Sequence, residues 1–314
     1  MNKVNYLQVS HEETGQRLDN FLARILKGVP KSHIYRIIRS GEIRVNKKRA
    51  EASTRIMTGD LIRIPPLRQS VDKSTKVSAS FEQRLRQSIM YEDEALLVIN
   101  KPFGVAVHGG SGISLGVIEA LRKTRVDLSY LELIHRLDRE TSGCLLLAKK
   151  RSFLRAVQAL FESREVEKTY WAILTNIWVG STAQEVNAPL QKNSLKSGER
   201  VVIVSEQGKA AKTQFKLLEN YKKACWVEIY PQTGRTHQIR VHSVCLGHPI
   251  LGDEKYGQKN DLYFEGNLKT RLYLHARAIQ FNLNGKRYYF QAELDQQFTE
   301  TLNQLRVGSM STYG

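Results

Sequence analysis

The stretch IHRLDRETSGCLLLAKK, residues 134–150, passes from a charge-dense loop directly into an apolar strand. In the loop, Asp138 lies between two arginines, Arg136 and Arg139. Nearby positive charge keeps a carboxylate ionised, as a nucleophilic carboxylate must be. Aspartate, serine and threonine are also common turn formers. The composition of this stretch alone therefore favours an Asx-turn with incidental ion pairs over a catalytic site.

Apolar runs of strand length dominate the sequence around and after this loop. A hairpin is expected at 89–102, and helices are expected at 113–124 and 152–163. Strands are expected at 144–150, 168–176, 200–206, 211–219, 225–231, 271–283 and 287–294. Many strands with a few interspersed helices predict an α+β fold with a mixed, mainly antiparallel sheet.

A small basic α/β module is expected before this sheet. In residues 17–26 apolar side chains recur at helical spacing, and Pro30 ends that helix. Ser32 can cap a second helix. Residues 42–50 and 61–66 then read as two short strands. A basic helix followed by a basic hairpin suits contact with a phosphate backbone.

The charge is unevenly spread along the 314 residues. There are 48 Lys and Arg against 31 Asp and Glu, a net charge of +17, and the first 80 residues hold about half of the excess. Such a surface favours a polyanion as partner. We expect a basic nucleic-acid-binding domain at 15–66, a polar linker at 67–84 and a second, larger domain at 85–314. The cations expected to bind RNA are Arg17, Lys31, Arg36, Arg39, Arg44, Lys47, Lys48 and Arg49.

Several classes of protein are not expected from this sequence. An apolar run of about 18 residues, which could span a membrane, does not occur. The first residues show no apolar core of a secretory signal. Cys144, Cys225 and Cys245 have no metal-ligand spacing and read as free thiols of a reducing compartment. We therefore expect a cytoplasmic protein with no membrane partner, most simply a monomer.

A second polar constellation is PQTGRTHQIRVHSVCLGHPILGD, residues 231–253. It reads as a turn that leads into a helix, with Thr236 as N-cap and Gly247 as the C-terminal stop. Arg240 follows His237 by three residues, so the two share a helix face and Arg240 could bind a carboxylate bidentately. A helix whose Arg and His face solvent fits the same pattern.

A metal site at His237, His242 and His248 is the alternative for this helix. The spacing fits no helical pair of ligands, and no acidic ligand is close in sequence on that face. No metal is therefore expected.

Two further stretches carry weaker signals. Strand alternation at 168–174 places Tyr170 on one face with Ala172 and Leu174, where it fits a core residue or a platform on which a base stacks. The glycine-rich run at 100–112 matches neither a P-loop nor a dinucleotide-binding motif. From the residues alone, the chain is a basic RNA- or DNA-binding protein with one candidate carboxylate.

The run HRLDRETSG resembles the signature of a pseudouridine synthase family that acts on large-subunit ribosomal and some transfer RNA. The family pattern is His-Arg-Leu-Asp, two variable residues, then Thr-Ser-Gly. NKPFGVAVH, EKTYWAIL and TGRTHQIRVH with GHPILGD follow in the family's order. The N-terminal module resembles the RNA-binding domain first named from small-subunit ribosomal protein four.

This resemblance implies roles for individual residues. Asp138 is the catalytic aspartate, and Arg136 occupies the space that the flipped uridine leaves in the RNA. Tyr170 stacks on the flipped base. Arg240 pairs with Asp138 and holds it, and Ile239 lines the apolar floor. The implied substrate is large-subunit (23S) ribosomal RNA or its assembly precursors.

The implied reaction isomerises uridine to pseudouridine. The bond from the anomeric carbon to N1 breaks, the base turns, and it rejoins through C5, so no metal and no cofactor is expected. The carboxylate could add to the sugar or to C6, or remove the 2′-proton to give a glycal. The base must first be extruded from its stack.

Two other functions fit parts of the sequence. One is a non-catalytic RNA-binding protein on a retired enzyme fold, and the other is a metal-dependent nuclease. Intact Asp138, Tyr170 and Arg240 favour the synthase over the first. The missing carboxylate–histidine cluster disfavours the second.

Overall fold

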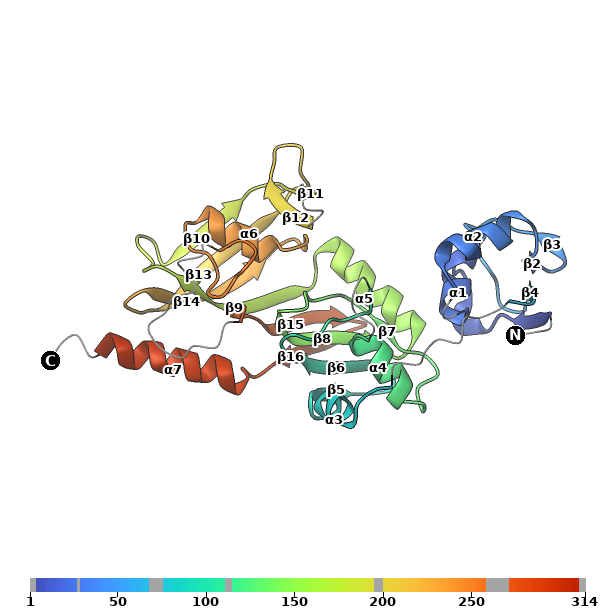
Figure 1. Cartoon of the computed structure of the whole chain (residues 1–314), viewed down its shortest axis with the longest axis horizontal. Helices are drawn as coiled ribbons and strands as arrows, with labels where there is room; N and C mark the ends of the chain where they lie inside the picture. Colours follow the sequence, from blue (N-terminus) through green and yellow to red (C-terminus); the bar gives the residue numbers. More distant parts are fainter. Residues whose placement is uncertain are drawn as a thin grey trace. The chain divides into compact units, whose positions relative to one another are not determined.

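The protein is described by a computed structural model that separates into two compact units (Figure 1). The described residues are 4–26, 29–67, 76–110, 115–194, 200–257 and 271–310. One unit comprises residues 1–77 with 150–152, and the other comprises the rest of the chain. Residues 68–75 of the expected linker lie outside the described residues.

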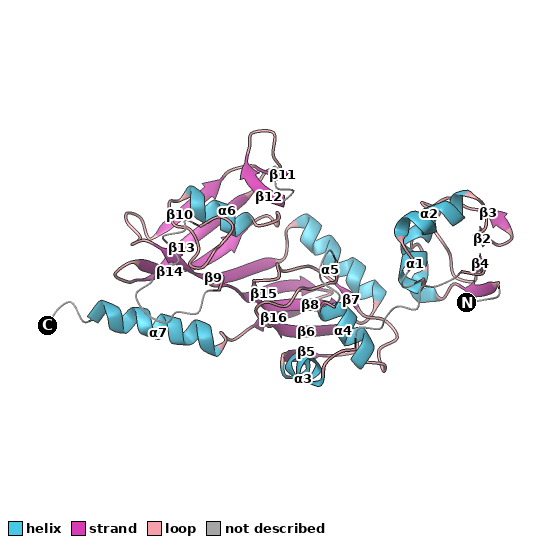
Figure 2. Cartoon of the chain, viewed as in Figure 1, coloured by secondary structure: helices cyan, strands magenta, loops and turns pink. Residues whose placement is uncertain are grey.

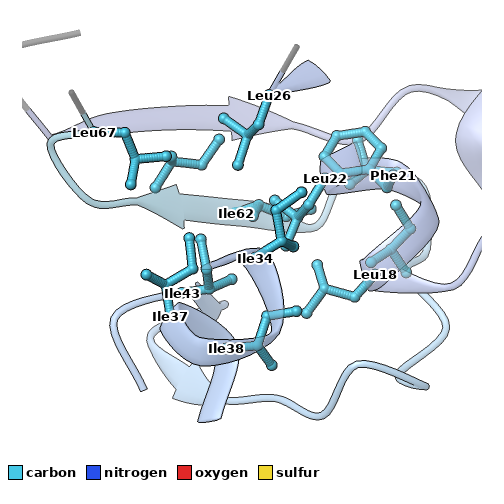
Figure 3. Packing of buried hydrophobic residues seen from close by; sticks show 13 residues of the cluster. Leu18, Phe21, Leu22, Leu26, Ile34, Ile37, Ile38, Ile43, Ile62 and Leu67 are labelled. Atoms are coloured by element: carbon cyan, nitrogen blue, oxygen red, sulfur yellow. The ribbon is translucent and has the colours of Figure 1, made fainter. Parts of the chain in front are cut away.

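The N-terminal unit is a four-stranded antiparallel sheet with two helices. Its elements are β1 (Asn5–Gln8), the 3-10 helix η1 (His11–Glu13), α1 (Leu18–Ile25), α2 (Lys31–Arg39), β2 (Arg44–Val45), β3 (Lys48–Arg49) and β4 (Leu61–Ile64). The strand order is β1-β4-β2-β3. Apolar side chains of both helices meet Ile62 of the sheet in one buried cluster (Figure 3). This cluster explains the helical spacing seen in residues 17–26.

The second helix of this unit begins earlier than the sequence suggested. Pro30, not Ser32, is the N-cap of α2. The Pro30 carbonyl accepts hydrogen bonds from the backbone N–H of His33 and Ile34, which closes the first turn. A cap position needs no N–H of its own, so proline fits there. Strand β1, which the sequence did not suggest, pairs with β4.

The larger unit is built on a ten-stranded mixed sheet (Figure 2). Its elements are α3 (Ala79–Gln87), β5 (Ile89–Glu92), β6 (Leu96–Lys101), α4 (Val117–Thr124), β7 (Glu132–Leu133), β8 (Ser142–Ala148), α5 (Arg151–Ser163), β9 (Glu167–Thr175), β10 (Ala183–Asn187), β11 (Leu190–Ser194), β12 (Arg200–Val204), β13 (Lys212–Asn220), β14 (Ala224–Pro231), α6 (Gln238–Cys245), β15 (Leu274–Leu283), β16 (Lys286–Gln291) and α7 (Gln296–Met310). The strand order is β10-β13-β14-β9-β15-β8-β6-β5, with β16 beside β15 and β7 beside β8, while β11 and β12 form a separate two-stranded sheet. Among the described strands, only β15 and β8 pair in parallel. The predicted α+β fold with a mainly antiparallel sheet is confirmed.

Helices cover both faces of this sheet. Ala172 and Leu174 of β9 belong to the buried cluster that includes Ile239 of α6. Their neighbour Ile173 belongs instead to the cluster that includes Phe298 of α7. Successive side chains of a strand point to opposite faces, so α6 and α7 lie on opposite sides of β9.

Several elements were not predicted from the sequence, and the segment expected to be a linker is partly helical. Helix α3 occupies residues 79–87 and so begins within the segment expected to be a linker. Ser78 caps α3, and Leu85 is the one buried side chain of this helix. One buried apolar residue gives no helical pattern in the sequence. Strands β10 and β11 and helix α7 were also missed. In the described part of the chain, no helix is long and apolar enough to cross a membrane.

Candidate active site

Asp138 lies in the loop between β7 and β8. Its side chain is 26% exposed and borders two adjoining pockets of the larger unit. The backbone N–H of Thr141 donates to the Asp138 carbonyl at 3.1 Å, which turns the chain into β8. Gly143 then has φ +110°, and a Cβ there would lie 2.3 Å from the carbonyl oxygen of Ala276 on β15. The glycine of HRLDRETSG is therefore required by the close approach of two parallel strands.

The floor of the first pocket is apolar and comes from three elements. Tyr170 of β9, Ile239 of α6 and Leu274 of β15 line it together. The same three side chains share one buried cluster. Burial raises the pKa of Tyr170, and the nearby charge of Asp138 adds to this, so the phenol stays neutral. The floor can hold a flat, uncharged ring.

Arg136 borders both pockets and is exposed to solvent. Among the residues that the structure describes, its side chain has no hydrogen-bond or ion-pair partner. A free guanidinium at the rim of a pocket is available to an incoming polyanion.

Arg240 does not form the expected pair with Asp138. Its Nε and Nη2 donate to the Asp253 carboxylate at 2.7 and 2.6 Å, and both side chains are buried. Asp253 Oδ1 also accepts the backbone N–H groups of Lys255 and Tyr256, each at 3.0 Å. A buried carboxylate that is already fixed by two N–H groups is a better partner than the partly exposed Asp138.

The charge of Asp138 nevertheless contributes to the pKa of Arg240. Burial opposes its ionisation, but the hydrogen bonds and charge of Asp253, with the charge of Asp138, outweigh burial and raise the pKa of Arg240. The resemblance implied Asp138 as the carboxylate partner of Arg240, so the pairing with Asp253 was not predicted. Asp253 ends the motif GHPILGD, so the signal was present.

Among the described basic side chains, His237 is the one that lies within 4.0 Å of the Asp138 carboxylate. Its Nε2 lies 3.8 Å from Asp138 Oδ2. His237, not Thr236, is the N-cap of α6, and it has the left-handed backbone conformation φ 52°, ψ 20°. Burial lowers its pKa against the opposing charge of Asp138. From the sequence, His237 was expected to share a helix face with Arg240, to face solvent or to bind a metal, and no role beside Asp138 was expected for it.

The three histidines of the alternative metal site have separate partners. His237 bonds to Tyr256, His242 to Thr213 and the Ala188 carbonyl, and His248 to the Thr175 carbonyl. No group of three or more potential metal-binding side chains occurs within the described ranges.

Lys101 is a further buried group beside the Asp138 loop that the sequence reading did not single out. Its Nζ donates to the carbonyls of Pro102, Val105 and Arg139 at 3.0, 2.8 and 3.1 Å. Burial lowers the pKa of Lys101 to about 7, although the charge of Asp138 opposes this shift. Lys101 therefore ties the NKPFGVAVH loop to the backbone next to Asp138.

The profile of the RNA pseudouridylate synthase family matches residues 95–243, which include the Asp138 loop, Tyr170 and Arg240. An S4 domain profile matches residues 16–62. The chain is 49% identical over 311 residues to ribosomal large subunit pseudouridine synthase C of Pasteurella multocida, covering 96% of this chain and 94% of that protein. The chain belongs to the RNA pseudouridylate synthase family.

Further relatives agree with this assignment. The chain is 47% identical over 310 residues to ribosomal large subunit pseudouridine synthase C of Escherichia coli strain K12, covering 96% of this chain and 97% of that protein. The solved structure of human RNA pseudouridylate synthase domain containing 4 superposes with a TM-score of 0.61 at 32% identity, over 72% of this chain and 96% of that one. This synthase therefore shares both the sequence and the fold of its family.

In the S4 domain of this synthase the cations expected to bind RNA are all exposed. Arg17 is the one held by a carboxylate, because its Nη2 pairs with Asp19 at 2.7 Å. Arg44 and Lys47 line a pocket with Tyr6 and with Arg63, a residue that the sequence had not marked as RNA-binding. The surface of this domain thus carries exposed cations beside an exposed aromatic ring.

Proposed function

We propose that this chain isomerises uridine to pseudouridine in large-subunit (23S) ribosomal RNA, with Asp138 as its catalytic carboxylate. The observation that carries the proposal is the position of Asp138 at the wall of a pocket with an apolar floor. The chain is similar over almost its whole length to ribosomal large subunit pseudouridine synthase C, and this similarity supports large-subunit ribosomal RNA as the substrate.

The pocket fits one extruded uridine. Tyr170 stacks on the uracil ring, with Ile239 and Leu274 beneath it. Arg136 enters the RNA and fills the space that the base has left. Unstacking costs a few kcal/mol, and the stacking on Tyr170 and the insertion of Arg136 offset it.

The reaction conserves all atoms of the uridine. The bond from the anomeric carbon to N1 breaks, the base rotates on the apolar floor, and the anomeric carbon bonds to C5. The C5 proton then leaves, and N1 gains a proton. The floor excludes water from the cleaved base, which prevents hydrolysis from competing.

The S4 domain supplies affinity for the RNA. Its exposed cations contact phosphates and position the substrate without reading bases. We place the reaction in the cytoplasm on ribosomal RNA or an assembly precursor, with the synthase acting as a monomer.

Release of tritium from RNA labelled at C5 of uridine tests the proposal. We expect wild type to release label from deproteinised large-subunit rRNA in EDTA, and Asp138→Asn to release none while binding the RNA equally well. Asp127→Asn, which alters an exposed carboxylate paired with Arg125, serves as the control and should retain activity. Label release by Asp138→Asn, or none by wild type, would contradict the proposal.

A further inference from the structure

His237 and Tyr256 connect the Asp138 carboxylate to strand β12, which pairs with β11. His237 Nδ1 lies 2.7 Å from the Tyr256 hydroxyl, and its Nε2 faces Asp138. The backbone N–H of Val202 on β12 donates to the same hydroxyl at 2.9 Å. His237 is the only Lys, Arg or His of the described chain within 4.0 Å of the Asp138 carboxylate.

The hydrogen bonds at Tyr256 favour one tautomer of His237. The hydroxyl oxygen already accepts the Val202 N–H, and its own proton needs an acceptor. Among the described atoms, that acceptor is His237 Nδ1. A neutral imidazole that accepts at Nδ1 carries its proton on Nε2. The Nε2–H group therefore points toward Asp138.

Two further features hold the ring in this place. Gln238, next in the chain, accepts from Thr233 Oγ1 at 2.7 Å and from the Arg235 backbone N–H at 3.0 Å, and its amide donates to Thr213 at 2.9 Å. These bonds fix the turn in which His237 has its left-handed conformation. The rings of His237 and Tyr256 also meet edge to face at 5.5 Å.

We propose that His237 is a positioning residue for Asp138 in the proposed reaction, that it donates a hydrogen bond from Nε2 to the carboxylate, and that Tyr256 imposes this tautomer. Arg240 cannot replace it, because Asp253 engages Arg240. The present separation of 3.8 Å is longer than a hydrogen bond and closes by a movement of about 1 Å.

The proton on Nε2 excludes His237 as the base that removes the C5 proton in this state. Its charge state is governed by groups from three segments: Asp138 in its loop, Arg240 on α6, and Asp253, Lys255 and Tyr256 in the following turn. Burial lowers the pKa of His237, so the ring is neutral near pH 7. A protonated ring would pair with Asp138 as an ion and hold it away from the sugar.

The first test reads the tautomer without any activity. Long-range ¹H–¹⁵N spectra of histidine-labelled wild type, with His237→Gln to assign the signal, should show an unprotonated Nδ1 for His237. Tyr256→Phe should convert this signal to a mixture of tautomers. A protonated Nδ1 in wild type would overturn the inference even if the protein is a pseudouridine synthase.

The second test separates positioning from binding and folding. We expect His237→Ala to lower kcat on the order of 10- to 100-fold with little change in KM or thermal midpoint. Glutamine can place an N–H near the same point, so His237→Gln should recover most of the loss. Tyr256→Phe should lower kcat by about 3- to 10-fold, the value of one neutral hydrogen bond. Tyr230→Phe, which removes a hydroxyl bonded to Glu228, is the matched control and should be unchanged.

The pH profile distinguishes this role from a merely structural one. A hydrogen bond donated to Nδ1 favours the neutral ring, so losing it raises the pKa of His237. The acid limb of kcat should therefore move to higher pH in Tyr256→Phe but not in the double variant with His237→Gln. An equal shift in both, or no recovery by His237→Gln, would refute the positioning role. If wild type releases no tritium at all, the proposed function fails instead, and the tautomer result still stands.

Discussion

In the S4 domain the cations expected to bind RNA are exposed, whereas two cations near Asp138, Lys101 and Arg240, are buried and hydrogen-bonded. Lys31, Arg39 and Lys48 extend from the surface of the S4 domain into solvent. Lys101 is fully buried, and Arg240 is 5% exposed. Exposed cations can neutralise the phosphates of a nucleic acid of any sequence and so release the counterions condensed on it. Buried ones are fixed before the substrate arrives, which suits a pocket that must orient one base.

Of the changes considered, breaking the buried Arg240–Asp253 pair should lower the free energy of unfolding the most. Arg240→Met leaves the Asp253 carboxylate buried without a countercharge, and we expect a loss of about 3–5 kcal/mol in the free energy of unfolding. The double variant Arg240→Met/Asp253→Asn removes both charges but keeps an oxygen for the N–H groups of Lys255 and Tyr256. It should regain most of the stability and none of the activity. Urea titration and tritium release measure the two quantities, and a fully stable single variant would contradict the argument.

Removing three exposed cations should give a smaller effect of a different kind. We expect Lys31→Gln/Arg39→Gln/Lys48→Gln to weaken RNA binding. The slope of log affinity against log salt should fall by about 0.7–0.9 for each phosphate that the variant no longer neutralises. Its kcat at saturating RNA and its stability should match wild type, because these side chains are exposed.

Filter binding at several salt concentrations checks this prediction. The matched control removes the same charge from the larger unit by Lys216→Gln/Lys222→Gln/Lys223→Gln. An equal fall in affinity in both triple variants would show that net charge, and not the S4 surface, determines binding.

The smallest expected effect is on the pH dependence of stability, and it comes from replacing Lys101. Its folded pKa, about 7, lies below the value of about 10.4 in an unfolded chain, so between these values the unfolded chain binds the extra proton. Stability conferred by this site therefore rises with pH through that window and is lost as pH falls toward 7. Relative to Lys101→Met, wild type should gain up to about 1.4 kcal/mol per pH unit between about pH 7 and 9. A constant difference between the two unfolding curves would mean that the three carbonyls keep the ammonium charged.

Much of the fold could be predicted because it depends on local patterns. The helical spacing in residues 17–26 and the apolar runs of β8, β9, β14 and β15 correspond directly to buried clusters. Helix α7 was missed although Phe298, Leu302 and Leu305 are buried on it at helical spacing. The parallel pairing of β15 with β8 depends on residues far apart in sequence and has no local signal.

The candidate site was predictable in its members more than in its interactions. Motif resemblance marked Asp138, Tyr170 and Arg240, and the structure brings all three to one pocket. The resemblance could not show that Asp253 binds Arg240, because two carboxylates compete for one guanidinium and their burial decides which of them pairs with it. His237 was overlooked for a related reason: its role depends on a left-handed backbone and on Tyr256, which neither spacing nor composition reveals.

The place of β15 in the strand order determines when this site can assemble. β15 lies between β9 and β8, so it joins the half of the sheet that carries Tyr170 to the half that carries the Asp138 loop. It is also among the last strands to be synthesised, more than 130 residues after Asp138. Such long-range pairing is slow, because the loop must close before the strands can pair. A nascent chain that ends before residue 274 lacks both Leu274 of the pocket floor and the strand that joins the two halves, so we expect the site to form only after β15 has been translated.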